Sequence, residues 1–379
     1  MKKIIRAVTV PQSHGFVEPM LPYLKGKYDV QLLSSAGDNL DRICREYNIV
    51  GHRVEMYRRM SPIKDLKSLY QLIRVFRKEK PFMVHSMTPK AGLLCMLAAW
   101  VTRVPRRVHT FTGLVWPTTT GFAKKILMFT DWLTCTCATH VIPEGQGVLN
   151  DLKRNITSKS MKVLGYGNVR GVDMVHFSRR PEIMEKADKL KKPDVFSFLF
   201  VGRLVGDKGI NELVEAFTQL YNKYVHVRLC LVGQFETELD PLKQITLDRI
   251  NSLSAIETVG PMYGDDLLAY YAASDCFVFP SYREGFPNTV LEAGAMGLPS
   301  IVTDINGSRE IIEHGKNGLI IPSKNVNELY LAMKQVVEDT SAREKMTANA
   351  RPLIESRFEK NFVQGCLIKF YEEIQNNRV

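Results

Sequence analysis

Short apolar runs alternate with longer amphipathic segments along the first half of the chain. Between residues 66 and 78, apolar side chains recur at positions 66, 69, 72, 73 and 76, a spacing that predicts a helix. The shorter runs are rich in β-branched residues and predict buried strands. Strands are predicted at 3–10, 28–33, 83–85, 107–111 and 139–142, a loop at 11–15, and helices at 22–26, 66–78, 91–102 and 121–137.

The same alternation restarts after a glycine-rich passage at 165–171. Strands that alternate with helices imply parallel sheets with right-handed crossovers. We therefore predict an α/β protein of two doubly wound, Rossmann-like domains, 1–168 and 175–358, facing a cleft, with a C-terminal helix at about 359–379 that packs back on the first domain. Strands are predicted at 196–201, 228–232, 258–259, 276–280, 300–303 and 318–321, with helices at 210–221, 265–273 and 289–296 and two more after the last strand.

Composition narrows the class of protein. The 379 residues are 45% hydrophobic and 24% charged, which excludes a disordered chain, a fibrous repeat and a disulfide-stapled miniprotein. The seven cysteines are scattered without a Cys-x-x-Cys pair, so we expect a reducing compartment. Cys135 and Cys137 lie within a predicted helix, and we expect their side chains to pack in the protein core. The most apolar stretch, 91–101, is shorter than the roughly 20 residues of a membrane-spanning helix, so no such span is predicted.

Charge is divided unevenly between the two halves. Residues 1–170 hold 27 Lys and Arg against 11 Asp and Glu, a net charge of +16, whereas residues 171–379 hold 24 against 29, a net charge of −5. This asymmetry predicts a polyanionic neighbour for the first half, either nucleic acid or an anionic lipid surface. The basic residues gather around one amphipathic helix and two later segments: Arg58, Arg59, Lys64, Lys67, Arg74, Arg77, Lys78, Lys80, Arg103, Arg106, Arg107, Lys124 and Lys125.

The densest cluster of chemically useful residues lies at 280–293. Glu284 follows a predicted strand, and Glu292 lies about one turn into the helix that begins near 287–289. The N-terminus of a helix attracts anions, and ionised carboxylates accept hydrogen bonds from hydroxyls. This layout suits a nucleoside diphosphate sugar, with hydroxyls on both sides of two phosphates. The structural alternative is a solvated loop carboxylate at Glu284 and a helix-surface charge at Glu292.

A second motif follows the strand predicted at 196–201. Arg203 and Lys208 lie five residues apart in a loop with Gly202, Gly206 and Gly209. Arginine can bind phosphate oxygens through two parallel hydrogen bonds, and lysine adds a point charge. The sequence lacks the P-loop pattern. We expect a phosphate-binding turn here, the alternative being a solvated turn.

These motifs, with the segments 273–281 and 306–318, resemble the retaining, GT-B-fold glycosyltransferases of family 4. The resemblance covers nearly all of residues 196–322. In the first half, 85–92 and 108–114 resemble members that build bacterial capsule, O-antigen or N-glycan-type oligosaccharides on a polyprenyl diphosphate carrier, often from a UDP-hexose or UDP-N-acetylhexosamine. The family commonly has a Gly-Gly-rich first loop, whereas residues 11–16 here contain the single glycine Gly15.

The resemblance implies a role for each matching residue. Arg203 and Lys208 would hold the diphosphate and stabilise the departing nucleotide, and Glu292 would bind the ribose. Glu284 would hold the hexose, and His109 would lie beside the reacting centre. The alternative for His109, and for an acceptor-pocket role of His85, is a structural histidine. The predicted catalytic residues are His109, Glu284, Arg203 and Lys208, and the predicted substrate-binding residues are Gly15, Phe16, His85, Lys90, Gly202, Phe286, Pro287, Asn288, Thr289 and Glu292.

No metal-ligand pattern is present in the sequence, so we expect no metal and no cofactor besides the UDP-sugar donor substrate. The expected partners are a polyprenyl-diphosphate-linked saccharide and the anionic inner leaflet, with the protein cytoplasmic and peripheral on the inner membrane. Nucleic acid is disfavoured because the sequence lacks known nucleic-acid-binding signatures. The alternatives are a UDP-sugar epimerase or hydrolase of the same fold and, ranked lower, a basic nucleic-acid-binding protein.

Overall fold

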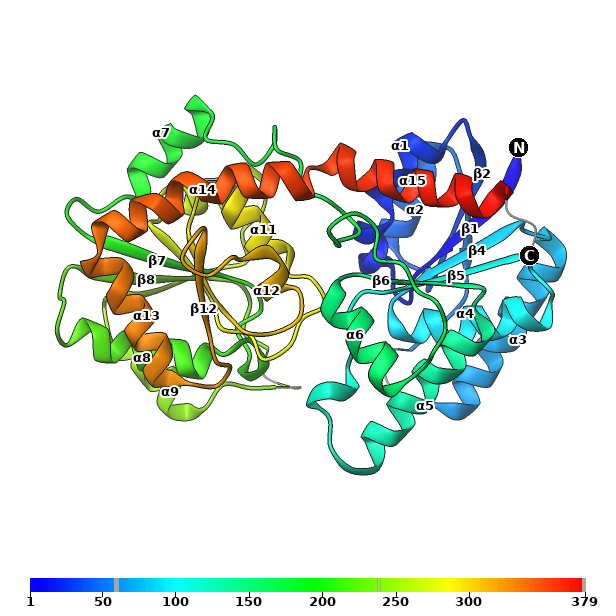
Figure 1. Ribbon diagram of the computed structural model, residues 1–379, viewed down its shortest axis with the longest axis horizontal. Helices are drawn as coiled ribbons and strands as arrows, with labels where there is room; N and C mark the ends of the chain where they lie inside the picture. The colour runs from blue at the N-terminus through cyan, green and yellow to red at the C-terminus, as the bar shows by residue number, and fades with distance from the viewer. Residues whose placement is uncertain (58–60, 237, 239, 377–379) are drawn as a thin grey trace. The chain divides into compact units, whose positions relative to one another are not determined.

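The computed structural model describes residues 1–57, 61–236, 238 and 240–376. The chain forms two compact units (Figure 1). Unit 1 consists of Met1–Gly171 and Asn361–Val379, and unit 2 of Val172–Lys360. The chain therefore passes twice between the units, once after Gly171 and once after Lys360.

Unit 1 is built on a six-stranded parallel sheet with the order β3-β2-β1-β4-β5-β6. This order reverses direction between β1 and β4, and ligands of such sheets bind at the carboxyl ends of the strands next to the reversal. The strands are β1 (Lys2–Ala7), β2 (Tyr28–Ser34), β3 (Val50–Arg53), β4 (Met83–Met87), β5 (Arg106–Phe111) and β6 (His140–Pro143).

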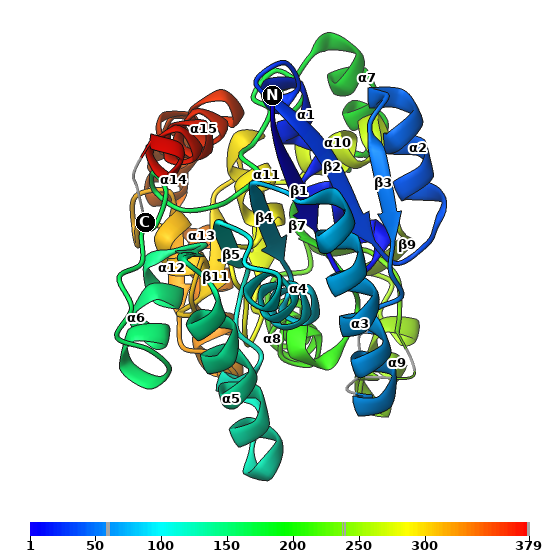
Figure 2. The ribbon, with the colours of Figure 1, turned by 90° about the vertical axis from the view of Figure 1, so that its right-hand side faces the viewer.

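Helices cover both faces of this sheet (Figure 2). One face packs against α1, α2 and α15, and the other against α3, α4, α5 and α6. Each helix buries an apolar stripe, as Leu72 and Phe76 of α3 do. The helices are η1 (Pro11–Phe16), η2 (Glu18–Met20), α1 (Leu21–Leu24), α2 (Asp38–Tyr47), α3 (Pro62–Glu79), α4 (Pro89–Val101), η3 (Trp116–Thr118), α5 (Gly121–Cys137), α6 (Gln146–Asn155) and α15 (Lys360–Asn376).

Unit 2 repeats the plan with a second six-stranded parallel sheet, in the order β12-β11-β10-β7-β8-β9. The reversal lies between β7 and β10, so the loops after these two strands are neighbours. The strands are β7 (Phe196–Val201), β8 (Val227–Val232), β9 (Ile256–Gly260), β10 (Cys276–Phe279), β11 (Ser300–Thr303) and β12 (Gly318–Ile321).

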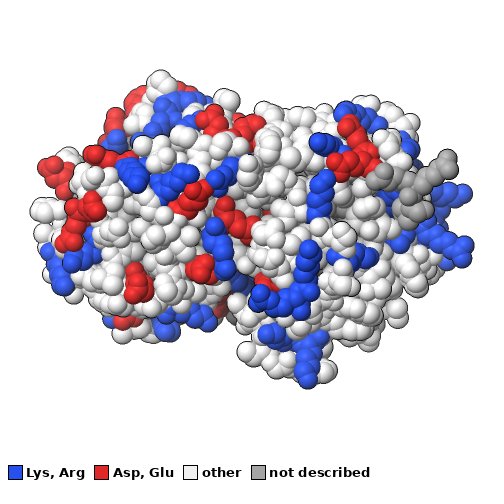
Figure 3. Space-filling model, in the orientation of Figure 1, with Lys and Arg blue, Asp and Glu red and all other residues white. Residues whose placement is uncertain are grey.

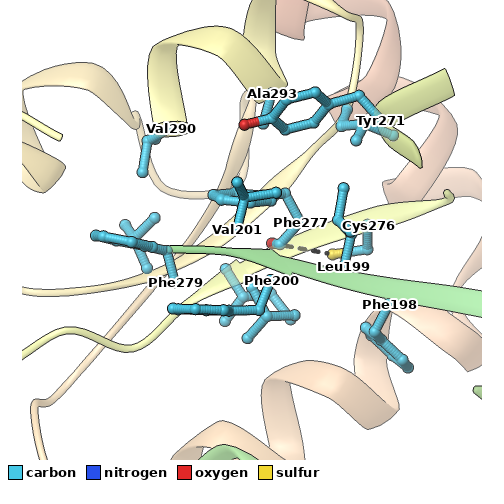
Figure 4. Packing of buried hydrophobic residues seen from close by; sticks show 14 of the residues in the cluster. Phe198, Leu199, Phe200, Val201, Tyr271, Cys276, Phe277, Phe279, Val290 and Ala293 are labelled. Atoms are coloured by element: carbon cyan, nitrogen blue, oxygen red, sulfur yellow. Dashed lines mark hydrogen bonds between the residues drawn. The ribbon is translucent and has the colours of Figure 1, made fainter. Parts of the chain in front are cut away.

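An aromatic core fixes the strands of unit 2. Figure 4 shows Tyr271, Val290 and Ala293 on one side of the sheet and Phe198 and Phe200 on the other. Helices α8 and α13 pack together, as do α7 with α10 and α11 with α14. The helices are α7 (Pro181–Leu190), η4 (Gly206–Lys208), α8 (Ile210–Tyr221), α9 (Gln244–Ser252), α10 (Gly264–Ala272), α11 (Asn288–Ala295), α12 (Ser308–Ile311), α13 (Val326–Glu338) and α14 (Thr340–Phe358).

The predicted α/β class is confirmed, but several elements were missed. The sequence did not predict α2, β3, α6, α7 or α9, each of which is short or mostly polar. The segment predicted as a loop at 11–15 forms the 3-10 helix η1, and three helices rather than two follow β12. Leu66, predicted on the apolar face of its helix, is exposed. Cys135 and Cys137 are buried in α5, as predicted.

Candidate functional site

The predicted site residues of unit 2 lie where its strand order reverses. The loop at 202–209 follows β7, and the loop at 280–287 follows the neighbouring strand β10. Gly209 has a left-handed backbone, with φ of 72°, and a Cβ atom there would lie 2.1 Å from the carbonyl oxygen of Pro280. Only glycine permits so close an approach of the two loops.

Hydrogen bonds then join these loops to each other. The backbone N–H of Tyr282 donates to the carbonyl of Asp207 at 2.8 Å, and the guanidinium of Arg283 pairs with the Asp207 carboxylate at 3.2 Å. The hydroxyl of Ser281 donates to the Glu284 carboxylate at 2.9 Å. The second loop is therefore positioned by the first, and the two form one surface.

Lys208 and Glu284 are brought together on this surface. The Lys208 ammonium forms an ion pair with Glu284 Oε1, and the two side chains are equally shielded, at 17% exposed each. The Lys208 ammonium also lies 5.5 Å from the centre of the Phe279 ring. A half-buried cation of this kind is screened less by solvent than a surface lysine, so it is suited to hold a phosphate.

Arg203 forms an ion pair of its own, separate from that of Lys208 and Glu284. Its guanidinium forms an ion pair with Glu236, a residue of the loop after β8, and its side chain is 55% exposed. Glu236 was not predicted, because nothing in the sequence of its loop shows that it reaches Arg203. An anion that binds Arg203 has to compete with this carboxylate.

Helix α11 begins beside Glu284. Its N-cap residue, Pro287, makes no side-chain capping hydrogen bond, so this end can attract an anion. Phe286 and Pro287 are buried, and Asn288 and Thr289 are half-buried. The turn before α11 is fixed from outside by Gly307, where a Cβ atom would lie 2.4 Å from a backbone carbonyl oxygen.

Glu292 lies one turn into α11 and contacts Tyr271 of α10. The Tyr271 hydroxyl donates to Glu292 Oε2 at 3.3 Å. Burial, together with the charge of Glu292 and this hydrogen bond, holds the pKa of Tyr271 well above its usual value. Tyr271 therefore stays a donor and orients the carboxylate, a role the sequence analysis did not identify.

In unit 1, Gly15, Phe16 and Lys90 follow the adjacent strands β1 and β4. Gly15 is exposed and faces open space, and Phe16 is half-buried. The Lys90 ammonium pairs with Asp65 at 2.5 Å, so it joins the starts of α3 and α4.

Thr88 is a further residue at this edge that the sequence analysis did not single out as a site residue. Its φ of 72° is rare for a β-branched side chain and costs about 1–3 kcal/mol. The hydroxyl of Thr88 lies 2.7 Å from that of Thr9 and accepts the Thr9 backbone N–H at 3.1 Å. Strain of this kind is concentrated at functional sites, which makes the edge beside Lys90 a candidate for acceptor contacts.

His109 lies inside unit 1 and is 1% exposed. Its Nδ1 atom lies 2.9 Å from the Ser86 hydroxyl, its ring contacts Phe111, and a Cβ atom at Gly92 would lie 2.4 Å from its ring. Burial lowers its pKa to about 3, so the imidazole is neutral at neutral pH. As a neutral ring it can donate or accept a hydrogen bond, but it supplies no positive charge.

His85 is equally buried, and both ring nitrogens are engaged. Nδ1 lies 2.5 Å from the Tyr371 hydroxyl and Nε2 lies 2.7 Å from the Thr110 hydroxyl. These contacts tie β4 to α15 and favour the structural alternative for His85. Because Ser86, not His85, is in register with His109, the two histidines lie on opposite faces of the sheet.

Two of the basic residues assigned to a surface are not on it. Arg106 is buried and donates to the carbonyl of Ile374 at 2.6 Å, and the half-buried Arg107 donates to the carbonyl of Cys137 at 2.6 Å. Both guanidinium groups therefore serve the packing of unit 1. Arg58 and Arg59 lie outside the described residues. The face drawn in Figure 3 carries both Lys or Arg and Asp or Glu side chains.

Within the described part of the chain, no three His, Cys, Asp or Glu side chains are grouped so as to hold a metal ion. Nor does any described helix have the length and apolar character needed to cross a membrane.

Two family models match the chain. The family described as "Glycosyl transferases group 1" matches residues 181–352, and "Glycosyl transferase 4-like" matches residues 8–141. The capsular polysaccharide biosynthesis glycosyltransferase CapM of Staphylococcus aureus is 32% identical over 376 residues, which cover 98% of this chain and 97% of CapM. The UDP-Gal:alpha-D-GlcNAc-diphosphoundecaprenol alpha-1,3-galactosyltransferase of Escherichia coli is 28% identical, over 84% of this chain and 87% of the relative.

Solved structures share the fold. HepE of Anabaena, in complex with UDP, superposes with a TM-score of 0.81 at 19% identity, over 98% of this chain and 100% of HepE. Sucrose-phosphate synthase of Thermosynechococcus elongatus has a TM-score of 0.79 at 18% identity, with 99% of each chain covered. The likeness confirms the predicted GT-B fold class of two Rossmann-like halves. With CapM related over almost its whole length, the chain belongs to the group 1, family 4-like glycosyltransferases.

Proposed function

We propose that the chain transfers a hexose or N-acetylhexosamine from a UDP-sugar, which binds to unit 2. The observation that carries this proposal is the Lys208–Glu284 pair beside the N-terminus of α11. A diphosphate bound there meets a half-buried ammonium and a helix N-terminus, while Glu284 and Glu292 accept hydrogen bonds from hydroxyls on the two sides of the phosphates. The E. coli relative is named for a UDP-Gal donor, which supports the choice of nucleotide.

The proposed chemistry is a retaining transfer without a metal. The bond between the anomeric carbon and the diphosphate oxygen breaks, positive charge develops on the sugar ring, and negative charge develops on the leaving UDP. Lys208, Arg203 and the backbone at the start of α11 would stabilise the diphosphate, which is where the largest electrostatic contribution to catalysis is expected. The acceptor oxygen forms its bond to the anomeric carbon on the face that the diphosphate leaves, and its proton passes to the departing phosphate oxygen.

We infer that the acceptor is a saccharide on a polyprenyl diphosphate carrier, used to build a surface polysaccharide. CapM is named for capsular polysaccharide biosynthesis, and the E. coli relative and a Campylobacter jejuni relative, 26% identical over 96% of each chain, are both named for diphospho-undecaprenol-linked acceptors. The edge of unit 1 that carries Gly15, Phe16 and Lys90 is the proposed acceptor site.

The test is a screen of UDP-sugars against a short lipid-diphosphate saccharide, with products identified by mass spectrometry. One UDP-sugar should give a mass increase of one hexose or N-acetylhexosamine, in EDTA as well as in Mg²⁺. NMR of the anomeric coupling should show an α-glycoside from an α-linked donor. A β-glycoside contradicts retention, and activity only with Mg²⁺ contradicts the metal-free mechanism.

We further propose that unit 1 binds the anionic inner leaflet through one layer of helices. Apolar side chains are exposed on α3 and α5 next to basic ones, and this mixture is typical of helices that lie at a membrane surface. Lys64 lies 4.2 Å from the centre of the Tyr57 ring, and Phe129 stacks on Trp132 at 5.6 Å. The proposed membrane-facing side chains are Ile63, Leu66, Tyr70, Phe122, Phe129 and Trp132, with Lys64, Lys67, Arg74, Lys124 and Lys125.

Vesicle sedimentation tests this surface. Wild-type protein should bind vesicles that contain anionic lipid and leave neutral vesicles unbound. The double variant Ile63→Ser/Phe129→Ser should bind anionic vesicles several-fold less, whereas Val225→Ser, which removes an exposed apolar side chain of unit 2, should bind like wild type. Equal binding to both kinds of vesicle, or none to either, overturns the proposal.

A further inference from the structure

Arg6 of β1 places a guanidinium group in the interior of unit 1. Its side chain is 0% exposed, and it is the largest of the fully buried side chains of the described chain. Nη2 contacts only the Sδ atom of Met87, at 3.5 Å, and a thioether is a weak acceptor. Nε and Nη1 have no hydrogen-bond partner among the described residues. Because an arginine remains charged in proteins, the Arg6 guanidinium is a buried cation. It lacks most of the hydrogen bonds that a buried cation is expected to make.

The two histidines near Arg6 do not neutralise it. His85 is in register with Arg6 on the neighbouring strand, and His14 is close enough for the charge of Arg6 to affect it. Burial and the positive charge of Arg6 lower the pKa of His14 to about 4 and that of His85 well below its usual value. Both rings are therefore neutral at neutral pH.

Helix α15 brings a second unsatisfied side chain to the same face of the sheet. Gln364 is 0% exposed, and neither atom of its amide has a partner among the described residues. It lies on the stripe of α15 that also presents Leu367 and Tyr371, and Tyr371 contacts His85. Two fully buried polar groups without partners are costly unless something else fills their hydrogen-bonding capacity.

A small pocket adjoins the guanidinium. Arg6 lines it together with His85, Thr110, Glu144 and Asn168, and its other walls come from the segment 164–169 and from α15. Its free interior is on the order of one water molecule. Glu144 is the one carboxylate among the lining residues, and Arg6 forms no ion pair within 4.0 Å with any described side chain.

We propose that this pocket is a binding site for one small inorganic anion of the size of chloride, which supplies the counter-charge that Arg6 requires. A cavity of this size has no room for a diphosphate. The two walls, 164–169 and the start of α15, are the segments next to the points where the chain passes between the units. A bound anion therefore holds α15 against the sheet.

Crystallography with bromide in place of chloride tests the site directly on the wild-type protein. The expected result is an anomalous peak within hydrogen-bond distance of Arg6 Nε or Nη1. A water molecule in that position without anomalous signal, or the Glu144 carboxylate against the guanidinium, overturns the proposal.

Thermal unfolding provides a second test, because all three tryptophans, Trp100, Trp116 and Trp132, belong to unit 1 and their fluorescence reports on it. At equal ionic strength, chloride at ten times its Kd should raise the Tm by about 3 °C over gluconate, which is too large for the pocket. Arg6→Met should lose this difference, and Arg45→Met, an exposed arginine of α2, should keep it. Equal Tm values of the wild type in the two salts contradict the proposal even if Arg6→Met does not fold.

Discussion

Lys208 and Glu284, 76 residues apart in the chain, form an ion pair at the point where the strand order of unit 2 reverses. Each is placed by the end of a different buried strand, β7 for Lys208 and β10 for Glu284. The pair keeps a half-buried ammonium from being an isolated charge while no donor is bound. When the donor binds, its diphosphate can replace Glu284 as the ion-pair partner of Lys208. The Glu284 carboxylate is then available to accept hydrogen bonds from the sugar hydroxyls.

This relationship predicts that neither partner can be removed without loss of turnover. Lys208→Ala and Glu284→Ala should each lower kcat about 10²-fold or more, the scale of losing one electrostatic stabiliser. Lys189→Ala, which removes an exposed lysine from α7, should leave kcat unchanged. Steady-state rates with the identified donor test this prediction. Wild-type rates in either site variant contradict the assignment of the donor site to Lys208 and Glu284.

The Arg203–Glu236 pair predicts that a substitution at Glu236 strengthens donor binding instead of weakening it. Glu236→Gln keeps the size of the side chain and removes the charge that competes with the donor phosphates for Arg203. Exposed ion pairs contribute about 0.2–1 kcal/mol, so the donor KM should fall about two- to fivefold. Arg203→Met should raise the donor KM instead. A donor KM in Glu236→Gln equal to or above that of wild type contradicts the competition.

Tyr271 is expected to act through Glu292. Tyr271→Phe removes the hydroxyl that donates to Glu292 and leaves the ring in the core. The donor KM should rise about three- to tenfold while kcat changes little, because the lost hydrogen bond orients a binding carboxylate and not the reacting atoms. Tyr270→Phe, one residue earlier on α10, is the matched control. A fall in kcat with an unchanged KM contradicts this positioning role.

Sequence patterns located the residues that follow buried strands, and they missed those whose role depends on tertiary contacts. Lys208 and Glu284 were found because loops after adjacent parallel strands must meet, and the strands were evident as apolar runs. Glu236 and Tyr271 were missed because nothing in the local sequence shows that they reach Arg203 and Glu292. The burial of Arg6 was equally invisible, since a single cation in an apolar run is also typical of an edge strand.

The missed secondary structure has a related cause. Helix α2 buries only Leu40 and Ile43 among charged residues, so its apolar stripe is too narrow to stand out from a loop. Arg106 and Arg107 were assigned to a basic surface for the opposite reason. Their charges were counted, but their hydrogen bonds to backbone carbonyls inside unit 1 exist only once α5 and α15 have packed.

The buried histidines predict that acid destabilises unit 1. Burial lowers the pKa of His14 to about 4 and that of His109 to about 3, against about 6.5 in an unfolded chain. Between pH 6.5 and 4 the unfolded chain binds protons that the folded chain does not. The histidines therefore make their full contribution to the free energy of unfolding above pH 6.5, and this contribution falls as the pH is lowered. Each of the two histidines should lower the free energy of unfolding by ~2 kcal/mol between pH 7 and pH 5.

Asp131 of α5 acts in the opposite direction, because burial raises its pKa to about 7. The folded chain then binds a proton between pH 7 and about 4 that the unfolded chain does not, which offsets part of the loss. Urea unfolding followed by tryptophan fluorescence should therefore show a weaker dependence on pH in His109→Gln and a steeper one in Asp131→Asn. His176→Gln, at an exposed site of unit 2, should match the wild type. A wild-type slope in His109→Gln would mean that the pKa of this imidazole is the same in the folded and the unfolded chain, and it would contradict the lowered pKa.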